Sequence, residues 1–324
     1  MRVCLAFSGF APLKPTMPGV LAAEEHGLDG IYCAEHITYH DAVVPATMYL
    51  QATERIEVGI VGLSWAGRHP GMAAMELSSL AEISDGRFRV QVGTGDPTLI
   101  GKLGRSLDKP AASTATFVAM LREILGGREL TQEQLGYGFS QFKIQPQAPC
   151  PPIDVMAMRP IMMKTACRVG DGVSLSAGAS KQYLRETVAL CEQELAANGR
   201  KREDFRISAV CIAAVNVDLD AARAPLRPML SLFPPDGTAV LAKGVLGDDF
   251  VQAAEAGGAF AAMKYYTPEV IDQIALISTP DGLADALAGY AETGIDELAL
   301  MLLNPPEDLP GIVKQLAVAR DSLR

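Results

Sequence analysis

The chain has 324 residues, of which 49% are hydrophobic, and this is enough to bury a large core. Its formal net charge of −10, without a run of Lys and Arg, argues against a nucleic-acid partner. The six cysteines are scattered and form no Cys-x-x-Cys pair, which favours a reduced, cytoplasmic protein. No apolar stretch reaches the ~20 residues that cross a bilayer, so we expect no membrane partner.

Short apolar runs alternate with amphipathic segments along the first half of the chain. The strands predicted there span residues 3–7, 30–33, 56–62 and 88–92. The helices predicted there span residues 17–26, 45–52, 70–84 and 114–125. The third of these helices carries Met72, Met75, Leu80 and Ile83 at helical spacing.

The second half of the chain repeats this alternation. Its predicted strands span residues 153–156, 172–175, 207–215 and 298–303. Its predicted helices span residues 161–169, 181–197, 219–256, 283–293 and 309–323. Two weakly patterned stretches, 97–110 and 126–152, are predicted to be long loops.

Eight strand-then-helix units predict a parallel sheet, and eight strands close a barrel. We therefore expect an α/β protein of the (β/α)₈ TIM-barrel type, with one domain over residues 1–324 and extended loops at the C-terminal barrel face. An open doubly wound sheet is the alternative, but no G-x-G-x-x-G follows the first strand.

In such a barrel the site is built from residues just past the carboxyl ends of the strands. His36 follows the second strand, where an imidazole can pass a proton, hydrogen-bond a heteroaromatic ring or serve only the structure. Asp96 follows the fourth strand and is either a ligand contact or an Asx cap. Trp65, the only tryptophan, follows the third strand as a lid, a stacking surface or a packed corner.

Two neighbouring turns have the character of an anion site, although each can also be an ordinary helix start. Arg159 stands directly before Pro160, so the next helix would present free N–H groups and one guanidinium to a phosphate. The turn over residues 176–180 has small residues that let a ligand approach the backbone. The sequence contains no H-E-x-x-H, no G-x-S-x-G and no P-loop, so we expect no metal and neither hydrolase nor kinase chemistry.

Several motifs together resemble the luciferase-like monooxygenase superfamily. They are Ala34-Glu-His36, Arg68-His-Pro70, the helix end and strand over residues 80–96, and the closing segments 278–282 and 290–296. The segment 151–166, followed by Gly170-Asp-Gly-Val173, resembles the methylenetetrahydromethanopterin reductases that use the deazaflavin coenzyme F420.

The resemblance implies that the barrel mouth binds coenzyme F420 and passes a hydride between ring carbon C5 and a C=N, C=C or C=O group. It implies catalytic roles for Glu35, His36 and Asp96. It implies a cofactor site made of His36, of a bulge with a non-prolyl cis peptide, of the Gly-Thr-Gly turn and of two phosphate-binding turns: Val61, Gly62, Leu63, Ser64, Gly93, Thr94, Gly95, Met158, Arg159, Ala177, Gly178 and Ala179. The residues expected to meet substrate are Ser8, Tyr39 and Trp65.

One departure from the reductases bears on the substrate. They carry an acid in the first strand, near the pterin, where this chain has Ala6. We therefore expect a different small-molecule substrate or a modified peptide. The alternatives are an FMN-dependent monooxygenase and a barrel that binds a cofactor without catalysis. The family also favours homodimers through the second and third helices.

Overall fold

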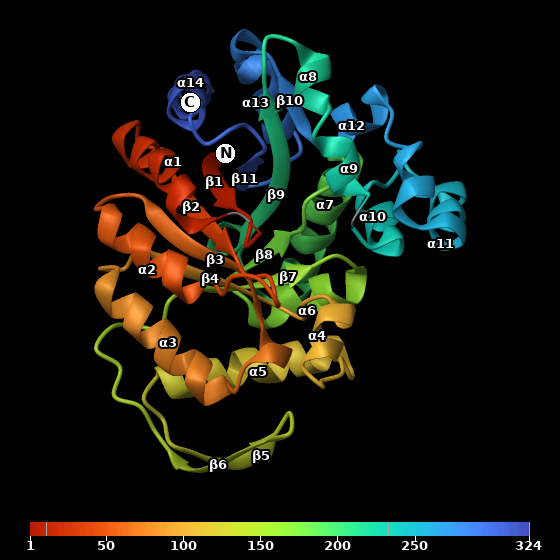
Figure 1. Ribbon diagram of the computed structural model, residues 1–324. Coiled ribbons are helices and arrows are strands. Elements are labelled where there is room, and N and C mark those ends of the chain that lie inside the picture. The colour runs from red at the N-terminus through yellow and green to blue at the C-terminus, as the bar shows by residue number, and fades with distance from the viewer. Residues whose placement is uncertain (11, 232, 324) are drawn as a thin grey trace.

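Eight parallel strands close into a barrel in the computed structural model, which describes residues 1–10, 12–231 and 233–323 (Figure 1). Strand β11 pairs with both β1 and β9, and β8 pairs with β9, so the ring is complete. The barrel strands are β1 (Arg2–Phe7), β2 (Gly30–Ala34), β3 (Glu57–Ser64), β4 (Phe88–Gly93), β7 (Ile153–Ala157), β8 (Gly172–Leu175), β9 (Arg206–Val215) and β11 (Glu297–Leu302). The predicted TIM barrel is confirmed.

Helices surround this barrel, as the alternating pattern predicts. Those that cover it are α1 (Leu13–Glu25), α2 (Val43–Ala52), α3 (Pro70–Ile83), α5 (Pro110–Leu125), α6 (Pro160–Val169), α7 (Lys181–Ala197), α13 (Leu283–Ala291) and α14 (Leu309–Asp321). The predicted helical stretch 219–256 is instead broken into α8 (Leu219–Arg223), α9 (Leu226–Leu230), α10 (Pro235–Leu241) and α11 (Asp248–Met263). Pro225 and Pro234 stand at two of the breaks, because proline cannot continue a helix.

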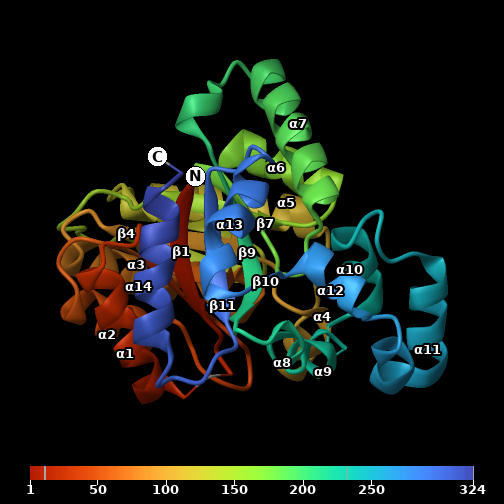
Figure 2. The ribbon, with the colours of Figure 1, turned by 90° about the horizontal axis from the view of Figure 1, so that it is seen from above.

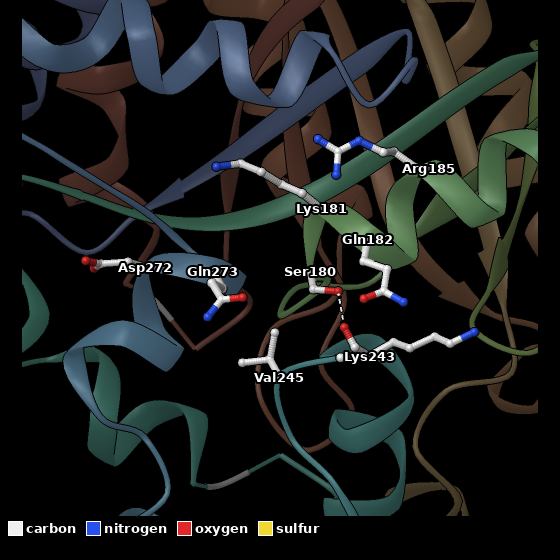
Figure 3. A pocket seen from close by; sticks show the side chains of 9 residues that line it. Ser180, Lys181, Gln182, Arg185, Lys243, Val245, Asp272 and Gln273 are labelled. Atoms are coloured by element: carbon white, nitrogen blue, oxygen red, sulfur yellow. Dashed lines mark hydrogen bonds between the residues drawn. The ribbon is translucent and has the colours of Figure 1, made fainter.

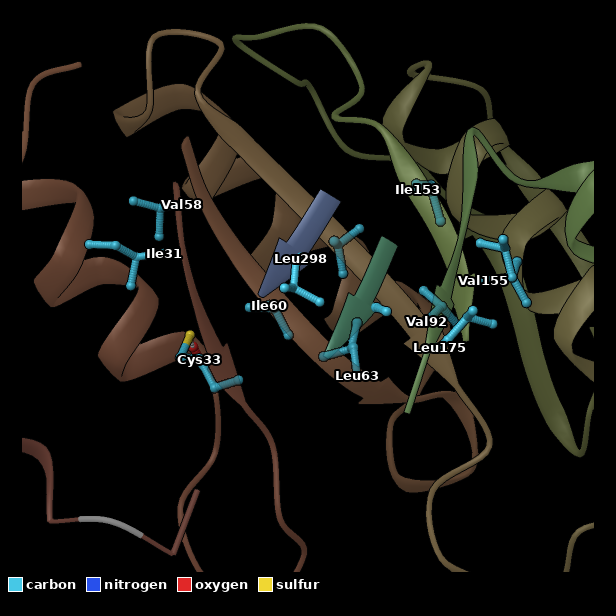
Figure 4. Close-up of a cluster of buried hydrophobic side chains, with 14 of the residues drawn as sticks. Ile31, Cys33, Val58, Ile60, Leu63, Val92, Ile153, Val155, Leu175 and Leu298 are labelled. Atoms are coloured by element: carbon cyan, nitrogen blue, oxygen red, sulfur yellow. Dashed lines mark hydrogen bonds between the residues drawn. The ribbon is translucent and has the colours of Figure 1, made fainter. Parts of the chain in front are cut away.

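This excursion after β9 continues through α12 (Pro268–Ile274) and the short strand β10 (Leu276–Ser278), which pairs with β9 outside the barrel. Figure 2 shows α10, α11 and α12 gathered on one side of the barrel. They have their own cluster of buried apolar residues, including Phe250 and Tyr266. The main core lies between the strands and the covering helices and contains Ile31, Ile60 and Val155 (Figure 4).

The amino-terminal end of the barrel interior holds balanced charges. Arg2 lies 2.8 Å from Glu297, and Arg206 lies 3.1 Å from the same carboxylate. Arg206 also donates to Glu57 at 3.2 Å. Deeper in the barrel, Arg89 lies 3.2 Å from the fully buried Asp154. Burial raises the pKa of Asp154 to about 7, since the nearby arginine only partly offsets the loss of water.

The two stretches predicted to be long loops contain regular structure. The first forms α4 (Pro97–Lys102), and the second forms a hairpin of β5 (Leu130–Gln134) and β6 (Tyr137–Phe142) that stands beside α3 and α5 (Figure 1). Strand β5 is mostly polar, and the aromatic residues of β6, Tyr137, Phe139 and Phe142, do not keep an alternating period, so the sequence gives no clear strand signal.

Helix α3 buries a different face from the one that its methionines mark. Ala73, Ala74 and Leu77 are fully buried, whereas Met72 is 53% exposed and Met75 is 46% exposed. No helix in the described part of the chain is long and apolar enough to cross a membrane.

Candidate active site

Apart from Val61, which lies within β3 next to the bulge, the predicted site residues lie near the carboxyl ends of barrel strands or follow them, so they belong to the carboxyl face. His36 is held there by the loop after β1. The Gly9 N–H donates to Nδ1 of His36 at 3.1 Å. A Cβ on Gly9 would lie 2.7 Å from that nitrogen and 2.7 Å from the Ala34 carbonyl oxygen, so only glycine fits.

This contact fixes the tautomer of His36. Because Nδ1 accepts a hydrogen bond, the ring proton of the neutral imidazole is on Nε2. Burial lowers the pKa of His36, which favours this neutral form. The side chain therefore offers a hydrogen-bond donor at Nε2.

Aromatic rings cover the other side of His36. The Phe10 ring lies 4.0 Å from the imidazole, measured between centroids, and Tyr39 meets Phe10 edge-on at 4.6 Å. Ser8 accepts a hydrogen bond from the Phe10 N–H at 3.2 Å and so orders the same loop. Tyr39 is 62% exposed. Two of the predicted substrate residues, Ser8 and Tyr39, thus lie next to His36.

Glu35 has protein partners on both carboxylate oxygens. Its Oε1 accepts the Ser64 N–H at 3.2 Å, and its Oε2 pairs with Arg68. Arg68 also donates to Glu76 of α3 at 2.9 Å. We call Glu35, Arg68 and Glu76 the brace. In this arrangement the Glu35 carboxylate supports the end of β3, and its acid–base role stays a prediction.

The predicted bulge after β3 is present. The register between β3 and β4 shifts between Val61 and Leu63, and Gly62 between them has φ of 86°. The Ser64 hydroxyl donates to the Thr94 carbonyl at 2.8 Å and ties the bulge to the β4 turn. The resemblance also implies a cis peptide bond in this bulge. That prediction is wrong for this chain, because all peptide bonds of the described residues are trans.

The turn after β4 brings Gly95 and Asp96 beside the bulge. Gly95 has φ of 78°, and a Cβ on it would lie 2.9 Å from the Ser64 hydroxyl oxygen. Asp96 is the N-cap of α4, since its Oδ1 accepts the Thr98 N–H at 2.8 Å and the Leu99 N–H at 3.1 Å. The Asx-cap interpretation therefore holds, while a direct contact to a ligand stays a prediction.

The turns after β7 and β8 frame the other side of the mouth. Arg159 precedes α6, as predicted, and its guanidinium lies 2.9 Å from Asp236 of α10. The Met158 carbonyl accepts a hydrogen bond from the Tyr183 hydroxyl at 2.7 Å. Gly178 has φ of 94°, with open space where a side chain would be. Exposed pairs such as Arg159–Asp236 contribute little stability, so the guanidinium can exchange this partner for a phosphate.

Trp65 is buried rather than exposed at the mouth. It is 3% exposed, and its Nε1 has no hydrogen-bond partner within the described residues. It lines a cavity of about 320 Å³ together with Arg105 after α4 and Leu135 at the tip of the hairpin. This placement favours the packed corner over the lid.

Sequence reasoning missed a basic pocket beside the turn after β8. Lys181 and Arg185 of α7 and Lys243 of the loop after α10 line it (Figure 3). The sequence shows no basic cluster at this place, because Lys243 is far from Lys181 and Arg185 in the chain. Over the described ranges, no three His, Cys, Asp or Glu residues are grouped so as to hold a metal ion.

The family model described as luciferase-like monooxygenase matches residues 9–297. The chain is 24% identical over 286 residues to the 5,10-methylenetetrahydromethanopterin reductase of Methanolobus tindarius, which covers 85% of this chain and 86% of that protein.

Solved structures share the fold. The coenzyme F420 dependent tetrahydromethanopterin reductase of Methanopyrus kandleri matches with a TM-score of 0.79 and 19% identity, over 98% of this chain and 97% of that one. The monooxygenase RslO1 of Streptomyces bottropensis matches with a TM-score of 0.78 and 21% identity, over 100% of this chain and 99% of that one. Since the family model covers most of the sequence, from the loop after β1 to the start of β11, the chain belongs to the luciferase-like monooxygenase family.

Proposed function

We propose that this protein is a coenzyme F420-dependent oxidoreductase, which passes a hydride between the deazaflavin and an organic C=N, C=C or C=O group. The observation that carries the proposal is His36 at the carboxyl face, held as a neutral Nε2–H donor by Gly9. The reductase relative supports the choice of cofactor, because a solved reductase of the same kind is described as coenzyme F420 dependent.

The backbone at the mouth fits a flat ring system with a phosphate-bearing side arm. Gly62 in the bulge and Gly93 at the end of β4 present backbone without side chains, and both lie near Met156. Gly178 leaves open space in the turn after β8. Small residues at strand ends allow such a close approach of a ligand to the backbone.

The bound coenzyme would supply the hydride chemistry at its C5. The chain's own residues would bind and orient the coenzyme and the substrate, and would shield the site from water. His36 would donate from Nε2 to the ring or to the substrate, and Phe10 would keep water from one face of the imidazole. The brace holds the Ser64 N–H and so fixes the bulge against which the ring would lie. Arg159 and the turn with Ala177, Gly178 and Ala179 would meet the phosphate.

The fold alone does not choose between cofactors, because a monooxygenase shares it. An FMN-dependent monooxygenase is therefore the second candidate. We propose a small-molecule or modified-peptide substrate. Ala6 stands in place of the acid of the reductases and is 4% exposed, so we expect poor turnover of methylenetetrahydromethanopterin.

Calorimetric titration of the purified protein with coenzyme F420 and, separately, with FMN tests the proposal. We expect micromolar or tighter binding of coenzyme F420 and weaker binding of FMN. Equal or tighter binding of FMN would overturn the assignment.

A further inference from the structure

Large apolar side chains are exposed at three places on the carboxyl face of the barrel. Phe10, in the loop after β1, is 52% exposed, and Tyr39, in the loop after β2, is 62% exposed. Leu103, at the end of α4, is 49% exposed. We call these three side chains the apolar wall. Single exposed apolar residues are normal on a protein surface, whereas a group of them at a barrel mouth is typical of a ligand site.

Two members of the apolar wall lie beside His36. The Phe10 ring lies against the imidazole and meets the Tyr39 ring edge-on. The backbone of the loop after β2 is closed on itself, since the Tyr39 N–H donates to the His36 carbonyl at 2.9 Å. The aromatic pair and the Nε2–H donor of His36 are therefore parts of one local structure.

The third member approaches the same loop from the direction of β4. A Cβ on Gly67 would lie 3.6 Å from a methyl carbon of Leu103 and 3.7 Å from a methyl carbon of Ile37. Ile37 follows His36 in the chain and packs with its half-buried side chain against the core. The apolar wall thus extends from the loop after β1, past His36, to the end of α4.

The charged groups next to the apolar wall have protein partners. The segments that join β1, β2, β3 and β4 to their next α-helices contain three carboxylates, Glu35, Asp41 and Asp96, and Arg68 is their only Lys or Arg. Glu35 pairs with Arg68. Asp41 and Asp96 each accept a backbone N–H at 2.8 Å, where α2 and α4 begin. This side of the mouth therefore favours a neutral ligand over a charged one.

We propose that the apolar wall binds the neutral, aromatic part of the substrate, whose C=O or C=N acceptor meets the Nε2–H of His36. The inference rests on the proposed function and narrows its substrate class. An aromatic pair in edge-to-face contact, such as Phe10 and Tyr39, offers a third ring the same favourable geometry. His36 supplies one directional contact, as in ligand sites whose lining is mostly apolar.

Two matched ligands test the apolar wall. Acetylnaphthalene is neutral and carries a C=O group beside its rings, and acetylnaphthoate adds a carboxylate to the same skeleton. Equilibrium dialysis without coenzyme gives the Kd of each ligand. We expect wild type to bind acetylnaphthalene about tenfold more tightly than acetylnaphthoate, because no unpaired cation of the adjoining segments compensates the carboxylate for its lost water.

Substitutions show whether the wall makes this contact. We expect Phe10→Ala, Tyr39→Ala and Leu103→Ala each to bind acetylnaphthalene several-fold to about tenfold more weakly, since each removes apolar contact area. Tyr39→Phe keeps the ring and should bind as wild type does. If Phe10→Ala lowers the melting temperature, the two other alanine variants still decide.

Phe260→Ala is the matched control for Phe10→Ala. Phe260 of α11 is 87% exposed, and α11 lies across the barrel from α1 and α2 in Figures 1 and 2. This variant should bind acetylnaphthalene as wild type does. Equal weakening in Phe260→Ala and in the wall variants would show non-specific binding to exposed apolar groups and would overturn the inference.

Coenzyme F420 provides the second arm of the test. Acetylnaphthalene should still bind when the coenzyme is saturating, because the substrate and the coenzyme occupy the mouth together. Displacement by the coenzyme would assign the wall to the coenzyme and overturn the inference. No binding of acetylnaphthalene, equal affinity for the two ligands, or wild-type affinity in all three alanine variants would also overturn it. If coenzyme F420 does not bind wild type, the proposed function fails, and dialysis without coenzyme still decides whether the wall binds a neutral aromatic ligand.

Discussion

At the scale of single residues, the hydrogen bond from Gly9 changes what His36 can do. A neutral imidazole whose Nδ1 accepts a hydrogen bond is a donor at Nε2 and a weak acid. Proton transfer from His36 would require protonation of Nδ1, which would break the contact with Gly9. The geometry therefore favours a role in orienting the ring or substrate.

This role predicts the behaviour of His36→Asn. Its amide keeps a donor, so binding of coenzyme F420 and turnover should fall together, by about tenfold or less. Loss of a true general acid would cost about 10²–10⁴-fold in turnover with nearly normal binding. Titration and steady-state rates measured on one preparation separate the two outcomes, and a lowered melting temperature without either pattern would make His36 structural.

The brace predicts a cost in stability for Arg68→Met. Removal of the guanidinium would leave Glu35, whose side chain is 5% exposed, without its cationic partner. We expect the free energy of unfolding to fall by about 3 kcal/mol, measured by chemical denaturation. Arg128→Met is the control, since Arg128 pairs with Glu123 at an exposed position and should cost less than about 1 kcal/mol. Equal losses in the two variants would contradict the brace.

At the scale of elements, the pairing of α6 with α10 bears on the phosphate site. We expect Arg159→Ala to weaken binding of coenzyme F420 by about 1.5–3 kcal/mol at low salt, with little effect on the melting temperature. Asp236→Asn removes the partner that now competes for the guanidinium, so it should leave affinity unchanged or raise it. If Arg159→Ala binds coenzyme F420 as tightly as wild type does, Arg159 does not bind the phosphate.

The sequence pattern predicted the eight barrel strands, their order and the residues that follow them, because parallel strands buried on both faces give distinct apolar runs. It missed the hairpin strands β5 and β6 and the short strand β10. It did not predict which face of α3 is buried. Alanines fill the narrow space against the barrel, and the larger methionines point outward. It also missed the brace and the basic pocket, since both depend on contacts between segments far apart in the chain.

The exposed apolar side chains on the outward face of α3 predict an interface between two copies of this chain. Met72 and Met75 on α3 are exposed, as is Val44 on α2, and the two helices pack against each other. We expect wild type to sediment as a dimer and Met72→Lys/Met75→Lys to sediment as a monomer, because a buried interface tolerates few unpaired charges. Val318→Lys on α14 is the exposed control. A dimer that survives the double substitution would move the interface elsewhere.

At the scale of the whole molecule, the buried charges of the barrel interior predict how stability depends on pH. The pKa of Asp154 is raised from 3.8 to about 7, so the folded state binds more protons than the unfolded state between these values. The free energy of unfolding therefore contains a part that falls as the pH rises from about 4 to about 7.

The substitution Asp154→Asn removes this pH-dependent contribution to the free energy of unfolding. The difference in stability between wild type and variant should change by about 3 kcal/mol across that pH range, with wild type relatively more stable at the acid end. Denaturation of wild type and variant at a series of pH values measures this change. A constant difference for Asp154→Asn would show that the pKa of its carboxyl is the same in the folded and unfolded states.

The burial of Trp65 has a consequence for spectroscopy. It is the only tryptophan, it is the residue after Ser64 of the bulge, and it lies where the hairpin tip closes on the loop after α4. Its emission should be that of an indole shielded from water, and detachment of the hairpin should shift that emission to the red before the barrel unfolds. A deazaflavin or flavin against the bulge would accept the excitation energy, so quenching of this one fluorophore reports occupancy of the mouth without turnover.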